Sequence, residues 1–439
     1  MSLKLRWAQF SGPFYLSVFG LALLLAAYIR FWAAPLSAGV DVPQFWAFAK
    51  VFDQYGLDFY RYADASLPIF PTAGWGFVYP PLWLLILRVA LLAAPASTAT
   101  NTMVDTSWRL AMKTPIIAAD LAIGCLLFWA VPGPKWRKLI FASLWLFHPT
   151  AWYESAVFGQ FDAIAAAFLL AAVILLEKGK DRLGFLFAGL AVMTKQHTLI
   201  PVAFMIAVSI RTLGWRRLAG DCAILAGVML AFSIPFLTTG NFFEYGRSFF
   251  LAGQTPDYQQ PLMYAFSGSG SLLTYLHQAL GWDTKGLLVY SIPLLIAAIL
   301  AGLWFSYKRQ LKPSQAALVG FLIFLIFIYR TNYQYLIIYI PLALLVAAQT
   351  KFRSERIMAL VAAMLPAVWL WIFNVAFWFY FLRPAHTWVF ATFEHLALTH
   401  IVPDYGYMAL AVTLMCLFIA YVICTFTKWS KPSKMLTPY

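Results

Sequence analysis

The chain alternates between long apolar stretches and short polar connections. Most stretches approach the length of about 20 apolar residues that a helix needs to cross the hydrocarbon core of a bilayer. Such segments must be helical, because lipid offers no hydrogen-bond partner for an open sheet edge. The pattern therefore predicts an all-α, polytopic membrane protein. The stretches cover approximately residues 13–34, 77–95, 109–131, 139–153, 160–176, 183–199, 200–210, 218–237, 286–306, 315–329, 333–349, 357–381 and 406–427.

The composition agrees with this pattern. Hydrophobic residues make up 62% of the chain and charged residues 11%, whereas soluble domains are about 45–50% apolar and about 25% charged. A soluble core would leave large apolar patches exposed. The cysteines form no CxxC pair and lie within apolar stretches, so neither a disulfide nor a zinc site is predicted. They are Cys125, Cys222, Cys416 and Cys424.

The net charge of +14 comes mostly from basic residues in short connections. The positive-inside rule places such loops in the cytoplasm, and nucleic acid is not a predicted partner. All of them can be cytoplasmic only if residues 77–95, which contain Arg88, lie in the outer interface without crossing. About twelve crossings then remain, with both termini in the cytoplasm; thirteen is the alternative. The basic connections are the N-terminus, residues 135–138, 178–182, 211–217, 308–312 and 351–356, and the tail from residue 428.

This topology leaves long segments on the outer side of the membrane, at residues 35–108, 238–285 and 382–405. A loop as long as the first is usually functional in a compact protein. We expect residues 1–237 to form a module of seven transmembrane helices with this long first exoplasmic loop. Residues 238–285 are then a second outer loop, and residues 286–439 a C-terminal transmembrane module.

Ionisable side chains at membrane depth are costly and are candidates for function. Asp41 lies just past the outer end of the first predicted helix, where a solvated loop carboxylate or a helix cap is the alternative. Arg109, Lys113 and Asp120 share one face of a later helix. A structural salt bridge within the bundle is the alternative for that group.

Further polar residues lie at predicted outer tips. Gln160 and Asp162 occupy one of them, with a helix N-cap as the alternative for Asp162. Lys195 and Gln196 lie between apolar stretches, far from the basic loops, so an anionic partner would explain the lysine. The segment from Arg330 to Tyr335 is the last tip, with an interfacial anchor as the alternative. Together these residues predict a site that faces away from the cytoplasm and can hold an anionic group.

The order of these motifs resembles the GT-C superfamily of multispanning glycosyltransferases. The resemblance spans roughly residues 10–350, and the closest branches are the glucosyltransferases of the N-glycan pathway and the mannosyltransferases that start the GPI core. The motifs that carry it are Asp41, Asp58-Phe59-Tyr60-Arg61-Tyr62, Tyr79-Pro80-Pro81-Leu82, the helix from Lys113 to Asp120, His148-Pro149, Gly159-Gln160-Phe161-Asp162, Lys195-Gln196, and Arg330 to Tyr335.

The chain departs from the glucosyltransferase branch at two tips. That branch has a His-rich tip where this chain has Gly159–Asp162, and a His-Glu-Lys stretch where this chain has Arg330 to Tyr335. The mannosyltransferase branch keeps an Asn and an Asp at the first tip. The resemblance therefore favours mannose slightly over glucose as the hexose transferred.

The resemblance also implies a mechanism. Asp41 would be the catalytic general base of an inverting transfer from a polyprenyl-phosphate sugar. Lys195, Arg330 and Lys113 would bind the donor phosphate, with Tyr335 and Gln196 as hydrogen-bond donors. The remaining donor-site residues are Asp120 and the pair Gln160 and Asp162, which would orient sugar hydroxyls or hold the lysines. Some superfamily members use a divalent metal, but the sequence offers no convincing ligand cluster, so no metal or other cofactor is expected.

The expected partners are a polyprenyl-phosphate-linked sugar donor, membrane lipid, and a glycan, glycolipid or protein as acceptor. The compact tail without a retention signal favours a prokaryotic plasma membrane, with the endoplasmic reticulum as the alternative. A transporter or lipid flippase for a glycolipid is the main competing class, although no internal repeat is evident. A non-catalytic scaffold is a further alternative, and would tolerate loss of Asp41.

Overall fold

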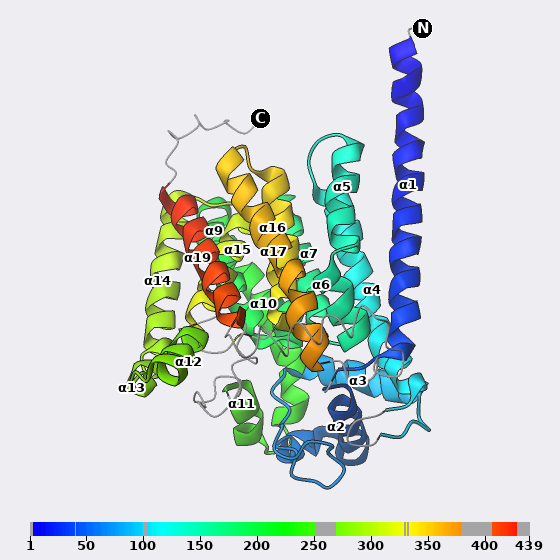
Figure 1. Ribbon diagram of the computed structural model, residues 1–439, viewed down its shortest axis with the longest axis vertical. Helices are drawn as coiled ribbons and strands as arrows, with labels where there is room; N and C mark the ends of the chain where they lie inside the picture. The colour runs from blue at the N-terminus through cyan, green and yellow to red at the C-terminus, as the bar shows by residue number, and fades with distance from the viewer. Residues whose placement is uncertain are drawn as a thin grey trace.

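The computed structural model describes residues 3–39, 41–99, 104–250, 269–328, 331, 333–378 and 406–427. Over these residues the chain is a bundle of helices, with an isolated β-bridge between Ala99 and Val104 (Figure 1). The helical segments are α1 (Leu3–Ala33), η1 (Ala34–Leu36), α2 (Asp41–Tyr55), η2 (Gly56–Tyr62), α3 (Pro81–Ala93), α4 (Thr106–Ala130), α5 (Lys135–Leu146), α6 (Pro149–Trp152), η3 (Tyr153–Phe158), α7 (Asp162–Glu177), α8 (Asp181–Thr194), η4 (Gln196–Thr198), α9 (Leu199–Leu213), α10 (Trp215–Leu237), α11 (Phe242–Phe250), α12 (Ser269–Leu280), α13 (Lys285–Leu288), α14 (Ser291–Arg309), α15 (Pro313–Phe327), η7 (Tyr333–Tyr335), α16 (Leu336–Gln349), α17 (Arg353–Trp378) and α19 (Gly406–Thr427).

The all-α membrane architecture predicted from the sequence is confirmed. Within the described residues, five helices are long and apolar enough to cross a membrane: Pro13–Leu36, Thr106–Ala130, Gln196–Leu213, Trp215–Leu237 and Ser291–Arg309. Shorter apolar helices are Pro81–Ala93, Pro313–Phe327, Leu336–Gln349 and Val412–Thr427. The number of twelve crossings stays a prediction.

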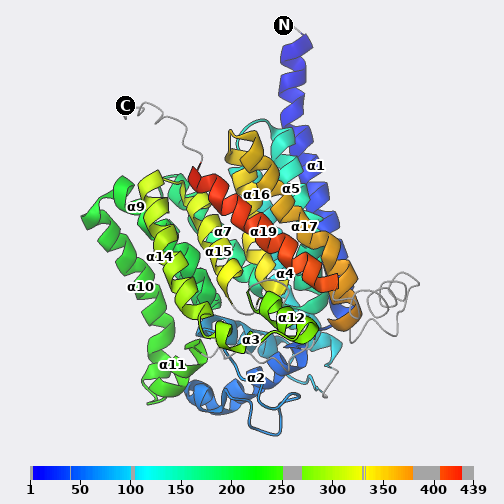
Figure 2. The same ribbon diagram turned by 60° about the vertical axis from the view of Figure 1, so that its left-hand side comes forward.

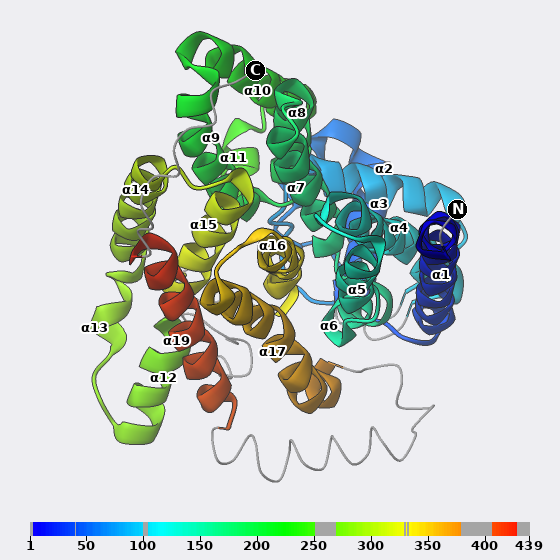
Figure 3. The ribbon, with the colours of Figure 1, turned by 90° about the horizontal axis from the view of Figure 1, so that it is seen from above.

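The apolar side chains divide between a protein core and an exposed outer surface. Nearly every residue of α16 is buried, and the end-on view shows this helix in the middle of the bundle (Figure 3). Helix α1 lies at one edge and leaves Leu21 and Leu24 about two-thirds exposed. A helix that is apolar all round requires an apolar environment on every side. The core supplies it for α16, and lipid would supply it for α1.

One end of the bundle carries helices that do not follow the bundle axis. Helix α3 lies across this end and packs on α2, which lies beyond it (Figures 1 and 3). An ion pair between Arg88 of α3 and Asp53 of α2 joins the two. The crosswise orientation agrees with the expectation that residues 77–95 do not cross. Helix α2 was not predicted from the apolar pattern; it lies within residues 35–108, the segment predicted to be a long outer loop.

The first and the last described helix both have one end at the other end of the bundle. The N-terminal end of α1 and the C-terminal end of α19 point the same way, while α2, α3, α11 and α12 lie at the opposite end (Figures 1 and 2). The first and last described helices therefore have these ends on the same side of the bundle, and the cytoplasmic placement of both termini stays a prediction.

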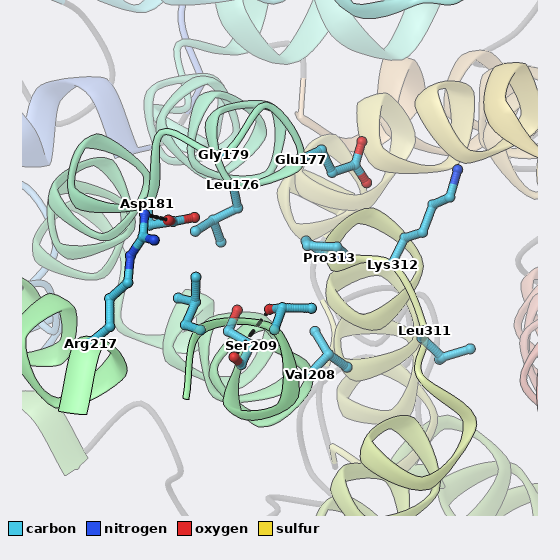
Figure 4. Close-up of a pocket in the computed structure, with 12 residues that line it drawn as sticks. Leu176, Glu177, Gly179, Asp181, Val208, Ser209, Arg217, Leu311, Lys312 and Pro313 are labelled. Carbon is cyan, nitrogen blue, oxygen red and sulfur yellow. Dashed lines mark hydrogen bonds and ion pairs between the residues drawn. The ribbon is translucent and has the colours of Figure 1, made fainter. Parts of the chain in front are cut away.

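A cavity of about 630 Å³ lies between the connection from α7 to α8 and the connection from α9 to α10 (Figure 4). The ion pair between Asp181 and Arg217 closes one side, at 2.5 Å. Glu177, at the end of α7, also lines the cavity. Glu177 is 15 residues from Asp162 on the same helix, which is about 22 Å along the axis. The cavity is therefore separate from the polar site at the start of α7.

Candidate functional site

Breaks between helices bring the predicted polar residues together. Asp41 is the first residue of α2. Gly159 ends the π-helix η3 with a φ of 87°, and Asp162 begins α7 two residues after Gln160. Lys195 lies in extended backbone between α8 and η4. Each break follows or precedes a buried helix, so the polar side chains enter the protein at the end of the bundle covered by α2 and α3.

The Asp41 carboxylate accepts a hydrogen bond from the Gln160 amide. The backbone fixes this contact, because the Gly39 amide donates to the Phe158 carbonyl at 2.8 Å. A Cβ on residue 39 would lie 2.5 Å from Phe158 Cδ2 and 2.7 Å from Phe158 O. Only glycine permits so close an approach, so the segment that leads into α2 is bonded directly to the segment that leads into Gln160.

Lys195 and Asp162 form a buried ion pair. The side chains are 2% and 0% exposed, so neither charge has access to bulk water. Such a pair is costly to dehydrate, and removing one partner leaves an uncompensated charge. One oxygen of Asp162, Oδ1, has no hydrogen-bond partner among the described residues. Asp162 Oδ2 therefore accepts from the lysine, and Oδ1 can accept from a further donor.

Aromatic rings surround the ammonium of Lys195. Its Nζ lies 4.7 Å from the ring centroid of Phe161, 5.2 Å from that of Tyr335 and 5.6 Å from that of Tyr79. A cation within about 6 Å of a ring face is attracted by the ring quadrupole. Phe161 in turn stacks on Trp83 of α3, with centroids 4.3 Å apart. Helix α3 thus supports the wall of the site.

The pKa of Tyr79 is shifted by burial and by the carboxylates of the site. Its surroundings raise the pKa of the phenol well above the usual value, first through desolvation and then through the nearby carboxylates of Asp41 and Asp162. The phenol therefore stays protonated at physiological pH and can donate a hydrogen bond. The same effect places Asp41 and Asp162 within electrostatic reach of one ring.

Several polar atoms in this region have no hydrogen-bond partner among the described residues. The Gln196 amide nitrogen donates to Val78 O at 2.6 Å, but its Oε1 is unpartnered. Gln160 Oε1 and His197 Nε2 are also buried without a partner. The His197 ring lies 4.5 Å from that of Tyr335, beside the lysine. Because buried polar groups are normally hydrogen-bonded, their grouping around Lys195 fits a ligand rich in hydroxyl groups.

Two residues that the sequence predicts at the donor site are held by protein groups in the structure. The ammonium of Lys113 is enclosed by backbone carbonyls. Asp120 is bound by Arg30, with Nε at 2.7 Å, and by the hydroxyl of Ser155 at 2.5 Å. Both ionic side chains are therefore engaged by protein groups. The structural salt bridge considered for this helix exists, but its cation is Arg30 of α1.

Arg30 is the cation of this salt bridge, and the sequence did not predict its role. It is fully buried, and beyond Asp120 it donates to the carbonyls of Leu146 and Ala26 at 2.8 and 3.1 Å. The available signal was an arginine inside an apolar stretch, which is a costly position. Its place near the outer end of α1 is equally typical of an interfacial anchor.

Arg330, the remaining predicted phosphate ligand, lies outside the described residues. Nearby, Gln334 is buried, and Tyr335 contacts the Lys195 ammonium through its ring. Within the part of the chain that the structure describes, no group of three or more His, Cys, Asp or Glu side chains could hold a metal ion. The site therefore offers a carboxylate, a paired cation, hydrogen-bonding amides and aromatic walls.

The class of this helical membrane bundle follows from a comparison with known protein families. Residues 77–327 match Glycosyltransferase family 87. Because the match covers more than half of the chain, the protein belongs to this family, and the predicted class, a membrane glycosyltransferase, is confirmed. No curated protein matches the chain.

Among solved structures, the chain is similar to ArnT from Cupriavidus metallidurans bound to undecaprenyl phosphate. The TM-score is 0.49 at 15% identity, over 94% of this chain and 77% of that chain. The same protein in the apo state gives a TM-score of 0.48 at 15% identity, over 95% of this chain and 77% of that chain.

Proposed function

We propose that this protein is an inverting glycosyltransferase that moves a hexose from a polyprenyl-phosphate carrier to an acceptor. Asp41 acts as the general base. Mannose is slightly favoured over glucose, because the polar tip at Gly159–Asp162 lacks the His-rich pattern of the glucosyltransferase branch. The acceptor is a glycan, glycolipid or protein, and the reaction takes place on the exoplasmic side of the membrane.

The observation that carries this proposal is the arrangement of Asp41 beside a buried cation. Gln160 holds the Asp41 carboxylate, and Lys195 with Asp162 lies within electrostatic reach of it. A base must accept a proton from an attacking hydroxyl, and a cation must meet the charge that builds on the leaving group. The site provides both within one group of residues.

The chemistry needs one carboxylate. Asp41 takes the proton of the acceptor hydroxyl while the hydroxyl oxygen attacks the anomeric carbon. The bond between that carbon and the phosphate oxygen breaks, and its electron pair leaves on the lipid phosphate. The phosphate needs little protonation, so a second catalytic acid is unnecessary. General-base assistance of this kind contributes about 10²–10⁴-fold.

Lys195 is the proposed phosphate ligand. Asp162 fixes the ammonium, and the aromatic rings of Tyr79 and Tyr335 exclude water, so the charge acts in a medium of low dielectric. The protonated Tyr79 phenol is a further proposed hydrogen-bond donor to the phosphate, besides Gln196 and Tyr335. Arg330 stays a proposed second cation of the same subsite.

The sugar is proposed to bind the acceptor atoms that the protein leaves unpartnered. Asp162 Oδ1, Gln160 Oε1 and Gln196 Oε1 each accept hydrogen bonds. Three such atoms suit the hydroxyl groups of a hexose. Lys113 and Asp120 leave the donor site in this proposal, because carbonyls and Arg30 engage them.

The exoplasmic location of the site is supported by the positions of the first and last described helices. The site lies at the end of the bundle opposite the N-terminal end of α1 and the C-terminal end of α19 (Figure 1). If the basic connections and both termini are cytoplasmic, the site faces outward. Nucleotide sugars are scarce there, whereas a lipid-linked donor is accessible.

The test is transfer by the purified protein in lipid, with radiolabelled polyprenyl-phosphate mannose, glucose and arabinose as donors. We expect transfer from mannose, lost in Asp41→Asn while donor binding persists. Transfer from glucose alone would correct the sugar. Absence of transfer from every lipid-phosphate donor, with transfer from a nucleotide sugar, would refute the proposed donor class.

A further inference from the structure

Lys113 is a buried lysine whose ammonium contacts only backbone oxygens among its described hydrogen bonds. Nζ donates to Ala34 O at 3.1 Å, Ser37 O at 2.5 Å, Ala156 O at 2.8 Å and Val157 O at 2.9 Å. The side chain is fully buried. Two of these carbonyls come from the segment that follows α1, and two come from the π-helix η3.

The carbonyls are available because both segments end beside the lysine. The last carbonyls of a helical segment have no amide partner within it. Ala34 and Ser37 belong to η1 and its C-terminal cap. Ala156 and Val157 lie in the last turn of η3, which Gly159 ends. A cation stabilises the negative end of such a segment, so one ammonium satisfies two helix ends at once.

These two segments lead directly to the candidate catalytic residues. The chain runs from Ser37 through Gly39 to Asp41, and from Val157 through Gly159 to Gln160. The Lys113 side chain also packs against the second segment, at Gly159. A Cβ added to Gly159 would meet Lys113 Cε at 3.0 Å. The lysine side chain therefore packs against Gly159, the residue directly before Gln160.

We infer that Lys113 is a positioning residue for the transfer reaction. It joins η1 to η3 and thereby holds the Asp41 carboxylate against Gln160. An ammonium has three protons, and here four carbonyls share them, so no donor is left for a phosphate. This inference rests on the proposed role of Asp41 as general base, and it gives Lys113 a task other than binding the donor.

The kinetic test uses Lys113→Met, which keeps the length of the side chain and removes its hydrogen bonds. We expect kcat to fall about 10²-fold, because a displacement of about 1 Å at the reacting atoms can cost that much. The Kd of the polyprenyl-phosphate sugar should stay unchanged. A raised Kd with unchanged kcat would overturn the inference in favour of phosphate binding, and unchanged kcat and Kd would also overturn it.

Lys50→Met is the matched control. Lys50 lies on α2 and its Nζ donates to one carbonyl, that of Pro95, at 3.2 Å. We expect wild-type kcat for this variant. Adding Lys113→Met to Asp41→Asn should cause no further loss of kcat, because the lysine acts through Asp41. A multiplicative loss in the double variant would assign Lys113 an independent role and overturn the inference.

Gly159→Ala keeps the lysine and tests the same contact if Lys113→Met does not fold. The added methyl strains the backbone at a φ of 87° and presses on Lys113 and Val42. We expect a lower kcat with unchanged donor Kd. Gly179→Ala is the control, because Gly179 has a similar φ of 70° and nothing within 4 Å of its Cβ. Equal kcat in the two variants would overturn the inference.

A cross-linking measurement tests the geometry without any activity. Asp41→Cys and Gln160→Cys are combined in a chain whose native cysteines are replaced with alanine, and a short bifunctional thiol reagent is added. We expect efficient cross-linking with Lys113 present and poor cross-linking after Lys113→Met. Equal cross-linking in both would overturn the inference. If no lipid-phosphate donor supports transfer, the proposed function fails, and this result still decides the role of Lys113.

Discussion

The ion pair between Lys195 and Asp162 gives a prediction in which stability and activity separate. Replacing Lys195 with Met leaves the Asp162 carboxylate alone in a site where its side chain is 0% exposed. Removing one partner of a buried pair costs about 3–5 kcal/mol of unfolding free energy. Replacing both partners with neutral side chains is often nearly neutral for stability. The double variant Lys195→Met with Asp162→Asn should therefore recover most of the lost stability.

The ion pair between Arg217 and Asp181 is the internal control for this magnitude. The Arg217 side chain is 62% exposed, so solvent screens the interaction. Exposed pairs contribute about 0–1 kcal/mol, and Arg217→Ala should cost no more than that. The comparison separates the effect of burial from the effect of simply removing an ion pair.

The assay is unfolding of each variant in detergent micelles, followed by transfer measured on the folded fraction. We expect low stability and low transfer in Lys195→Met. In the double variant we expect recovered stability and a rate that stays low, because the phosphate ligand is missing. Wild-type transfer in the double variant would refute the role of Lys195. An unfolding free energy for Lys195→Met within about 1 kcal/mol of wild type would refute the buried pair.

Two further substitutions test the support of the site. Gly39→Ala places a methyl group against Phe158 and should abolish transfer, whereas Gly20→Ala in α1, with nothing within 4 Å, should keep wild-type transfer; activity assays on both variants decide this. Arg30→Met leaves the buried Asp120 carboxylate without its cation and should lower the unfolding free energy by about 3–5 kcal/mol. Donor Kd, measured on the folded fraction of that variant, should be unchanged, and a large increase would return Asp120 to the donor site.

The bundle could be predicted because its signals are local. Apolar stretches such as residues 109–131 and 218–237 correspond closely to α4 and α10. The basic connections and Arg88 indicated that residues 77–95 lie in the interface, and α3 lies across the bundle end (Figure 3). Helix α2 was missed, because it is only 15 residues long and a third of its residues are charged or amide side chains, unlike an apolar crossing.

Most residues of the candidate site could be predicted from the sequence, but their partners could not. Lys195 was expected to need an anionic partner, and the structure supplies Asp162, 33 residues earlier in the chain. Lys113 looked like a phosphate ligand because its partners are backbone carbonyls, which leave no trace in side-chain patterns. Asp120 finds Arg30, 90 residues away, and no spacing rule connects positions so far apart.

The central claim is that Asp41 removes the proton from the acceptor in the transfer step. Its most direct test is a single-turnover measurement on protein preloaded with polyprenyl-phosphate mannose, comparing wild type with Asp41→Asn. We predict that the rate of sugar transfer falls by about 10²–10⁴-fold, while the amount of bound donor stays the same. A transfer rate within about tenfold of wild type, with donor equally bound, would contradict the role of Asp41 as general base.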